Sequence, residues 1–133
     1  MMDRFTKGLE TIKQYVNEEE VARMVDSDAL ADIAPDLRKM IIEFAYGDVY
    51  SRQGLDAKSR ALVVITAVVT QGAIQQTKTH ITRGLYVGLT PTEIVEALLQ
   101  LVPYIGFPCV QNALTVAQQV FQEKQLSVKL DDV

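Results

Sequence analysis

The chain has 133 residues, a length that suits one domain able to bury a core of its own. Its 17 acidic residues outnumber its 13 lysines and arginines, so the basic patch that nucleic-acid binding depends on is missing and we expect no nucleic-acid partner. The single cysteine, Cys109, excludes an intrachain disulfide and a Cys-rich zinc site, and it favours a reducing, cytoplasmic setting. No apolar run has the length of a signal peptide or a membrane span, so we expect no membrane partner either.

The first 25 residues predict two helices. Apolar side chains recur there at intervals of three and four, which places them on one helical face: Phe5, Leu9, Ile12 and Val16. Asn17 is a suitable cap for a second helix over residues 18–25, because its side-chain oxygen can accept a hydrogen bond from a backbone amide of the first turn. Three glutamates open that helix, where the helix dipole favours negative charge.

A third helix is expected between Pro35 and Ala45, since proline is tolerated at the first helical position. Its apolar positions are Leu37, Met40, Ile41, Phe44 and Ala45. Gly47 and Gly54 are then expected to bracket an exit loop. Asp56 is the next candidate N-cap.

The run ALVVITAVV, from Ala61 to Val69, is apolar on every side. Such a helix is typically buried, here in the core of the fold or of an oligomer. Gly72 is expected to end it, and the next helix should run from about Ile74 to Val87 and stop at Gly88. The apolar side of that helix is expected to hold Ile74, Ile81 and Leu85.

The sharpest local signal is TPTE over residues 90–93, a capping box with proline at the first helical position. It predicts a helix that starts at Pro91 and stops before Pro103. A last helix should begin near Pro108. The polar tail after Lys124 is expected to be loose, although alternating apolar residues in it could pair with a neighbour: Leu126, Val128 and Leu130.

Together these elements predict an all-α fold, a compact bundle of about six helices in a single domain over residues 1–133. No internal repeat or shift in composition marks a second domain. Apolar residues make up 48% of the chain, which is more apolar surface than one small subunit easily hides, so we expect an oligomer.

Two segments contain the only histidine and most of the glycines and aromatic residues: FAYGDVYSRQGLD over residues 44–56 and THITRGLYVGLTPTEIVEALLQLVPYIGFP over residues 79–108. With the KxHI step at residues 78–81 and the Asn112-Ala113 pair, they resemble the carboxymuconolactone decarboxylase family of the alkylhydroperoxidase-D-like superfamily. The resemblance covers roughly residues 30–123. It implies an all-α, alkylhydroperoxidase-D-like subunit that self-associates as a trimer or hexamer.

The redox branch of that superfamily carries Cys-x-x-Cys-x-x-x-His with an upstream glutamate, because peroxide reduction needs a nucleophilic thiolate and a resolving thiol. If His80 is matched to the histidine of this motif, the two cysteines fall on Ala73 and Gln76, neither of which is a thiol. Cys109 lies far along the chain, in surroundings typical of a small buried hydrophobic residue. A dithiol peroxidase is therefore disfavoured. Peroxiredoxin-type activity, as labelled for the superfamily, and a non-catalytic oligomeric protein are the alternatives.

The decarboxylase branch needs no thiol and no cofactor. In the reaction that the resemblance implies, a carboxylated unsaturated lactone loses carbon dioxide, and the electron pair left behind spreads toward the lactone carbonyl. The site would need a cationic anchor for carboxylates, a hydrogen-bond donor for the oxyanion and a proton donor for the enolate carbon. We therefore expect a carboxy-lyase that acts on a small-molecule carboxylate, with no metal.

His80 is the first candidate for the proton donor, because the unperturbed pKa of histidine lies nearest neutrality. Gln76 and Arg83 lie four residues before it and three after it, so they share its helical face. Arg52 and Arg60 are further candidate anchors, since a forked guanidinium matches a carboxylate. The resemblance marks His80, Arg52 and Arg60 as motif positions.

Glu43 is the second catalytic candidate, and Tyr104 is a candidate substrate contact. A carboxylate on an apolar face is costly unless it is paired, so Glu43 is either bonded to an arginine or poised as an acid or base. Tyr104 can equally be a core or interface aromatic, and His80 can equally be a hydrogen-bonded packing residue. Convergence of His80, Arg52 and Arg60 on one concave pocket would favour an enzyme.

Overall fold

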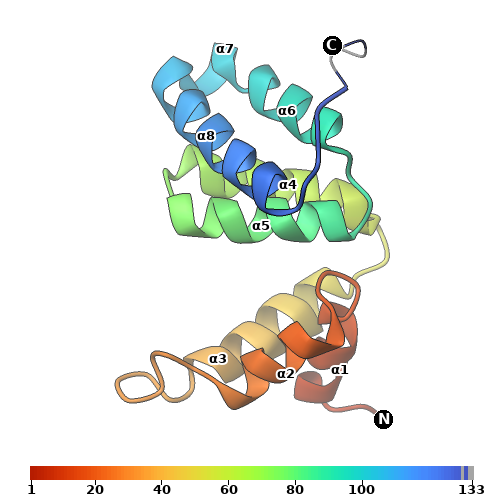
Figure 1. Cartoon of the computed structure of the whole chain (residues 1–133). Coiled ribbons are helices and arrows are strands. Elements are labelled where there is room, and N and C mark those ends of the chain that lie inside the picture. The colour runs from red at the N-terminus through yellow and green to blue at the C-terminus, as the bar shows by residue number, and fades with distance from the viewer. Residues whose placement is uncertain (130, 132–133) are drawn as a thin grey trace. The chain divides into compact units, whose positions relative to one another are not determined.

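The computed structural model describes residues 1–129 and residue 131 (Figure 1). Every regular element in this part of the chain is a helix, which confirms the all-α class. The helices form two compact units, Met1–Asp56 and Ala57–Val133, and the single domain expected from the sequence stays a prediction. None of the described helices is both long enough and apolar enough to cross a membrane.

The first unit comprises α1 (Arg4–Ile12), α2 (Glu18–Asp26), α3 (Leu37–Met40) and the π-helix η1 (Ile41–Tyr50), into which α3 runs directly. The expected cap of α2 is confirmed. The side-chain oxygen of Asn17 accepts a hydrogen bond of 2.8 Å from the amide of Glu20. At the start of α1, the side-chain oxygen of Asp3 accepts a hydrogen bond of 2.7 Å from the amide of Thr6.

Two glycines let α1 and η1 approach closely. A Cβ at Gly8 would lie 2.1 Å from the carbonyl oxygen of Ile42, and one at Gly47 would lie 2.7 Å from that of Arg4. The expectation that Gly47 opens an exit loop is therefore wrong. Gly47 is buried inside η1, and the chain leaves that helix only after Tyr50. Its missing side chain serves helix packing rather than a turn.

The predicted start and apolar face of the third helix also need correction. The helix begins at Leu37 rather than at Pro35, and the π-helical backbone that follows changes which positions share a face. Phe44, an expected apolar-face residue, is 62% exposed. Ile42 and Tyr46 are buried in its place, and the Tyr46 ring stacks on that of Tyr50 with 4.3 Å between ring centroids.

The second unit comprises α4 (Ala57–Thr70), α5 (Ile74–Tyr86), α6 (Pro91–Gln100), α7 (Val102–Ile105) and α8 (Phe107–Glu123). Figure 1 shows α4 and α5 side by side, with α6 and α8 packed over them. Their apolar faces meet in one core, in which the most deeply buried large side chains are Ile65, Ile81, Ile94, Leu98, Val110 and Val120. This core fixes the orientation of α5, the helix that carries His80.

The helix ends of this unit follow the local signals. Gly72 and Gly88 have φ angles of 70° and 107°, and in both cases the following amide donates to the carbonyl five residues earlier, at 3.0 Å. Both predicted stops are thereby confirmed. The capping box is confirmed too, because the Glu93 amide donates to the Thr90 hydroxyl at 3.0 Å and the Thr90 amide donates to the Glu93 carboxylate at 2.9 Å.

One prediction about apolar faces is left open and another is wrong in part. Only one side of α4 packs in the core of this unit, and on the opposite side Val63 is 60% exposed, so burial of that side in an oligomer stays a prediction. Ile74 was expected on the apolar side of α5, yet it is 56% exposed, whereas Ile81 is completely buried. The cause is geometric, since α6 and α8 cover only part of the surface of the α4–α5 hairpin.

The tail is less loose than its polar composition suggests. Val128 packs against the core of the second unit, and the Lys129 amide donates to the Thr92 hydroxyl at 3.2 Å. The tail therefore returns along the start of α6. Leu130, the third alternating residue, lies outside the described residues.

Candidate functional site

His80 lies near the middle of α5 and is half-buried. Burial penalises the charged imidazolium, and the positive charge of Arg83 opposes it further. Together they lower the pKa of His80 from 6.5 to about 4. The ring is therefore neutral at pH 7 in the free protein, whereas sequence reasoning started from its unperturbed value.

No hydrogen bond joins the His80 ring to another side chain in the part of the chain that the structure describes. The threonines beside it on α5 are engaged elsewhere. The hydroxyls of Thr77, Thr79 and Thr82 each donate to the backbone carbonyl four residues earlier, at 2.9, 3.2 and 2.9 Å. The ring nitrogens of His80 are thus open to a bound molecule.

This environment predicts an acid-sensitive stability. Between pH 6.5 and about 4 the unfolded chain protonates its histidine while the folded chain does not, so stability falls as the pH falls through this window. One pH unit of pKa difference corresponds to about 1.4 kcal/mol, and after solvent screening of a half-buried ring we expect a loss of about 2 kcal/mol. Urea unfolding at pH 7 and pH 4.5 should show this loss in the wild type. In His80→Gln it should be absent, and equal pH dependence in the two proteins would contradict the burial of a neutral ring.

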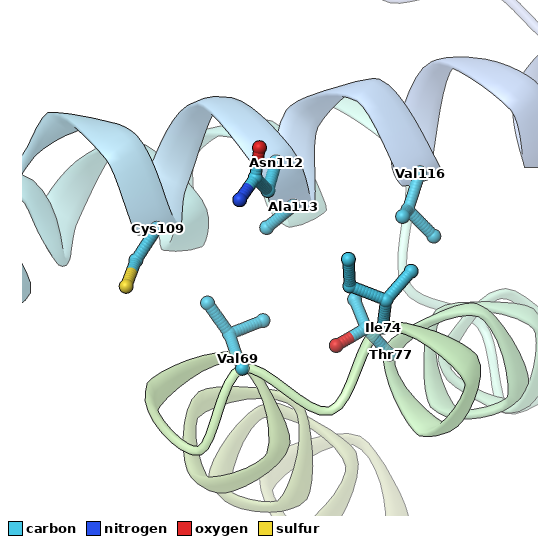
Figure 2. Close-up of a pocket in the computed structure, with 8 residues that line it drawn as sticks. Val69, Ile74, Thr77, Cys109, Asn112, Ala113 and Val116 are labelled. Carbon is cyan, nitrogen blue, oxygen red and sulfur yellow. The ribbon is translucent and has the colours of Figure 1, made fainter.

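A small cavity of about 50 Å³ lies one helical turn from His80, where the end of α4, the start of α5 and the first half of α8 meet (Figure 2). None of the described residues that line it is charged. Its lining residues are Val69, Gly72, Ile74, Thr77, Cys109, Asn112, Ala113 and Val116.

Sequence reasoning did not assign this cavity. Two of its lining residues, Asn112 and Ala113, were noted only as a matching pair, and Thr77 was not singled out at all. Thr77 is a threonine with 3% of its surface exposed, three residues before His80. The sequence signal that could have indicated the cavity is the hydroxyl of Thr77, a polar group one helical turn from the candidate catalytic residue His80.

Cys109 is half-buried and lines the cavity, so it is more accessible than the buried hydrophobic residue that we expected. It has no second thiol to resolve an oxidised sulfur, because the chain contains one cysteine. We predict that Cys109→Ser leaves turnover essentially unchanged, measured as substrate consumed per folded molecule. Thiol-dependent peroxide consumption by the wild type that is lost in Cys109→Ser would instead restore the redox alternative.

The structure brings some of the candidate residues together. Gln76, His80 and Arg83 all lie on α5. A Cβ at Gly84 on α5 would lie 3.9 Å from the Cβ of Ala61 on α4. Arg83 directly precedes Gly84 and Arg60 directly precedes Ala61, so the two arginines belong to the same end of the α4–α5 hairpin. Tyr104, by contrast, lies on α7 and is 78% exposed.

Glu43 and Arg52 belong to the first unit. Glu43 is half-buried and lines an open groove of about 450 Å³ together with Arg4, Met40, Ile41, Phe44 and Ala45. The guanidinium of Arg4 is committed to Asp48, at 2.7 Å. Arg52 is exposed and interacts with another group of the chain. Convergence of Arg52 with His80 and Arg60 stays a prediction.

No group of three or more histidine, cysteine, aspartate or glutamate side chains able to hold a metal occurs among the described residues. The expectation of a reaction without metal or cofactor is still a prediction. It depends on a chemistry in which the substrate accepts its own electron pair.

Comparison with known proteins relates the chain to one family. The model of the carboxymuconolactone decarboxylase family matches residues 35–119. An uncharacterized 15.0 kDa protein of Paracoccus denitrificans is 35% identical over 101 residues, which cover 74% of this chain and 75% of the relative. The 4-carboxymuconolactone decarboxylase of Acinetobacter baylyi is 31% identical over 120 residues, covering 90% and 88%. The nitrosuccinic acid decarboxylase of Metarhizium robertsii is 30% identical over 122 residues, covering 90% and 82%.

The family match spans more than half of the chain, and it includes α5 with His80 and Arg83 as well as most of α8. The two decarboxylases extend the similarity to nine-tenths of the chain. The all-helical fold agrees with the fold that the sequence resemblance implied. The chain therefore belongs to the carboxymuconolactone decarboxylase family.

Proposed function

We propose that the protein is a carboxy-lyase that removes carbon dioxide from a small acid with more than one carboxyl group, without a cofactor. The observation that carries this proposal is the similarity, over 90% of the chain, to two relatives named as decarboxylases of different acids. Carboxymuconolactone and nitrosuccinic acid each have more than one carboxyl group. A cationic anchor beside a proton-carrying group would suit both kinds of acid.

The proposed reaction breaks the bond between the carboxyl carbon and its neighbour. Carbon dioxide leaves and the electron pair of the broken bond spreads into the conjugated electron-withdrawing group. A proton then adds to the carbon that carries the displaced electron pair, which is the enolate carbon in an unsaturated lactone. We assign the anchor for a carboxylate to Arg83, with Arg60 as a second cation at the same hairpin end. Gln76 would donate a hydrogen bond to the developing oxyanion, and His80 would deliver the proton.

The remaining candidates have secondary places in this proposal. Glu43 is the alternative proton source, Arg52 a further anchor and Tyr104 a substrate contact. Glu43 and Arg52 come from the first unit and Tyr104 from an exposed position on α7. Alanine substitution of each, compared with the same substitution at Arg83, would rank them by the turnover that is lost.

Incubation of the purified protein with 4-carboxymuconolactone and with nitrosuccinic acid tests the proposal directly. We expect carbon dioxide release above the buffer rate with at least one of them. Thermal unfolding on the same sample confirms that the protein is folded. If a folded sample releases carbon dioxide from neither acid, the proposed substrate class is wrong.

We also propose that the subunits associate as a trimer or hexamer. Large apolar side chains remain exposed within each unit, among them Phe44, Val63 and Phe107. An exposed apolar surface of this kind is typical of an association surface. We predict that multi-angle light scattering at micromolar concentration gives three or six times the subunit mass of 14.8 kDa. A stable monomer under these conditions would contradict the prediction.

A further inference from the structure

The cavity of Figure 2 has a buried floor and an open rim. The floor consists of four side chains from three helices, each with at most 5% of its surface exposed: Val69 of α4, Thr77 of α5, and Ala113 and Val116 of α8. At the rim, Ile74 is 56% exposed, Cys109 is half-buried and Asn112 is exposed. A small molecule can therefore enter and leave the cavity past these three residues.

The volume of about 50 Å³ limits the size of a bound molecule. A cavity of about 150 Å³ in a protein core holds one benzene molecule, so a third of that volume suits a molecule of about two or three non-hydrogen atoms. The acids named for the two decarboxylase relatives have about a dozen non-hydrogen atoms each and are too large. Carbon dioxide, which is a linear triatomic molecule, has the right size.

The lining of the cavity suits the charge distribution of carbon dioxide, which has an electron-poor carbon between two electron-rich oxygens. Three of the four floor residues present only methyl groups. The Thr77 hydroxyl donates its proton to the backbone carbonyl of Ala73 at 2.9 Å, so it offers a bound molecule only its lone pairs. Those lone pairs can face the carbon of carbon dioxide, and the side-chain amide of Asn112 can donate a hydrogen bond to an oxygen.

The cavity begins next to the residue that we propose as the proton donor. Thr77 and His80 are three positions apart on α5, which places their Cβ atoms roughly 5–6 Å from each other. In the proposed reaction the bond between a carboxyl carbon and its neighbour breaks, the electron pair stays with the organic fragment, and carbon dioxide leaves. The departing group thereby changes from a charged carboxylate into a neutral molecule, which enters an apolar space at much lower cost.

We infer that this cavity receives the carbon dioxide that the proposed reaction releases. This inference rests on the proposed function, because it assigns a site to one of the two products. Cleavage of the carbon–carbon bond can reverse as long as carbon dioxide stays beside the electron-rich carbon. A cavity that takes the molecule away from this carbon gives the proton time to add first.

Binding is tested without any substrate, by nuclear magnetic resonance of the methyl groups in the full chain. The probes are carbon dioxide and nitrous oxide, a neutral linear triatomic gas that does not acidify the buffer. The reference is nitrogen-saturated buffer at the same pH. We expect both gases to shift the methyl signals of the four floor residues and to leave those of Ile12, which is buried in the first unit, unchanged. Unchanged floor signals with both gases would overturn the inference.

Formate tests whether the cavity prefers a neutral molecule. It has as many non-hydrogen atoms as carbon dioxide, but it carries a negative charge. We expect it to leave the floor signals unchanged at the same pH, because the described lining residues include no cation and a buried charge without a partner is costly. Shifts with formate as large as those with nitrous oxide would overturn the assignment to the neutral product.

Ala113→Val and Ala67→Val form a matched pair of variants. Ala113 lies on the cavity floor, whereas Ala67 is exposed on α4 and does not line the cavity. Ala113→Val fills the space, so it should lose the gas-induced shifts of Val69 and Val116 and lower kcat several-fold. Ala67→Val should keep the shifts and the wild-type kcat, and thermal unfolding shows that each variant is folded.

Full gas-induced shifts in folded Ala113→Val would overturn the inference. So would a wild-type kcat in an Ala113→Val protein that has lost the shifts. If Ala113→Val does not fold, the wild-type response to the two gases and to formate decides.

Binding and turnover are measured separately, so the two proposals fail separately. Gas-induced shifts in a protein that decarboxylates neither acid would support a site for small neutral molecules and contradict the proposed reaction. Turnover in a protein whose floor signals never move would support the reaction and overturn the inferred product site.

Discussion

His80→Ala is expected to lower turnover by about 100- to 10,000-fold while the protein stays folded. This is the usual contribution of a positioned general acid or base, and the variant lacks the group that would carry the proton to the enolate carbon. The measurement is kcat on whichever acid releases carbon dioxide, together with the thermal midpoint of the same sample. Gln75→Ala is the matched control, because Gln75 is exposed on the same helix and outside the proposed site.

The opposite pattern would identify a packing residue. If His80 only fills space, its removal should cost about 1–3 kcal/mol of stability and leave turnover per folded molecule little changed. Most of the wild-type turnover in folded His80→Ala would remove the residue from the mechanism. Glu43, Tyr104 or a bound water would then be the proton source to examine next.

Gly8→Ala is expected to destabilise the first unit by about 3 kcal/mol. The added methyl group would lie 2.1 Å from the carbonyl oxygen of Ile42, and a backbone atom cannot yield as a flexible side chain does, so α1 must shift away from η1. Chemical unfolding should report the loss as a lower denaturant midpoint.

Gly54→Ala is the control for the same chemical change. Nothing lies within 4 Å of a Cβ at Gly54, so its stability should stay within about 0.5 kcal/mol of the wild type or rise slightly. If Gly8→Ala behaves like Gly54→Ala, α1 and η1 are not packed as closely as the structure shows.

Helix boundaries were predictable from sequence wherever the signal is local. Asn17 caps its helix through an amide three residues away, and the capping box at Thr90 is complete within four residues. Gly72 and Gly88 stop their helices because glycine adopts a positive φ without strain. Each of these interactions is decided by neighbours in the chain, so the sequence alone contains it.

Features that depend on distant partners were not predictable. Glycine is common in loops, yet Gly47 lies inside η1. There it leaves room for α1, which lies some forty residues earlier in the chain. The π-helical backbone changes which residues of the Ile41–Tyr50 segment share a face, so Phe44 points away from the core. The ALVVITAVV helix is apolar all round, and tertiary packing alone decides which side is covered.

The candidate site divides in the same way. Helical spacing was enough to predict that Gln76 and Arg83 lie on the same helix as His80, within four residues of it. The titration of His80 was not predictable, because its pKa is lowered by burial, which depends on how the folded chain packs around α5. The cavity near Thr77 joins segments about forty residues apart, and no spacing rule connects them.

The most direct test of the proposed reaction incubates the wild type and His80→Ala in deuterated buffer, each with 4-carboxymuconolactone or with nitrosuccinic acid. Mass spectrometry then follows the release of carbon dioxide and the formation of the second product. Decarboxylation by the wild type should release one carbon dioxide per acid consumed. The product should contain deuterium on the carbon that takes up the proton, which is the enolate carbon of the unsaturated lactone or, in nitrosuccinic acid, the carbon that lost the carboxyl group. His80→Ala should form this product at least about 100-fold more slowly. If the folded wild type consumes neither acid, or consumes one without releasing carbon dioxide, the protein is not the decarboxylase proposed here.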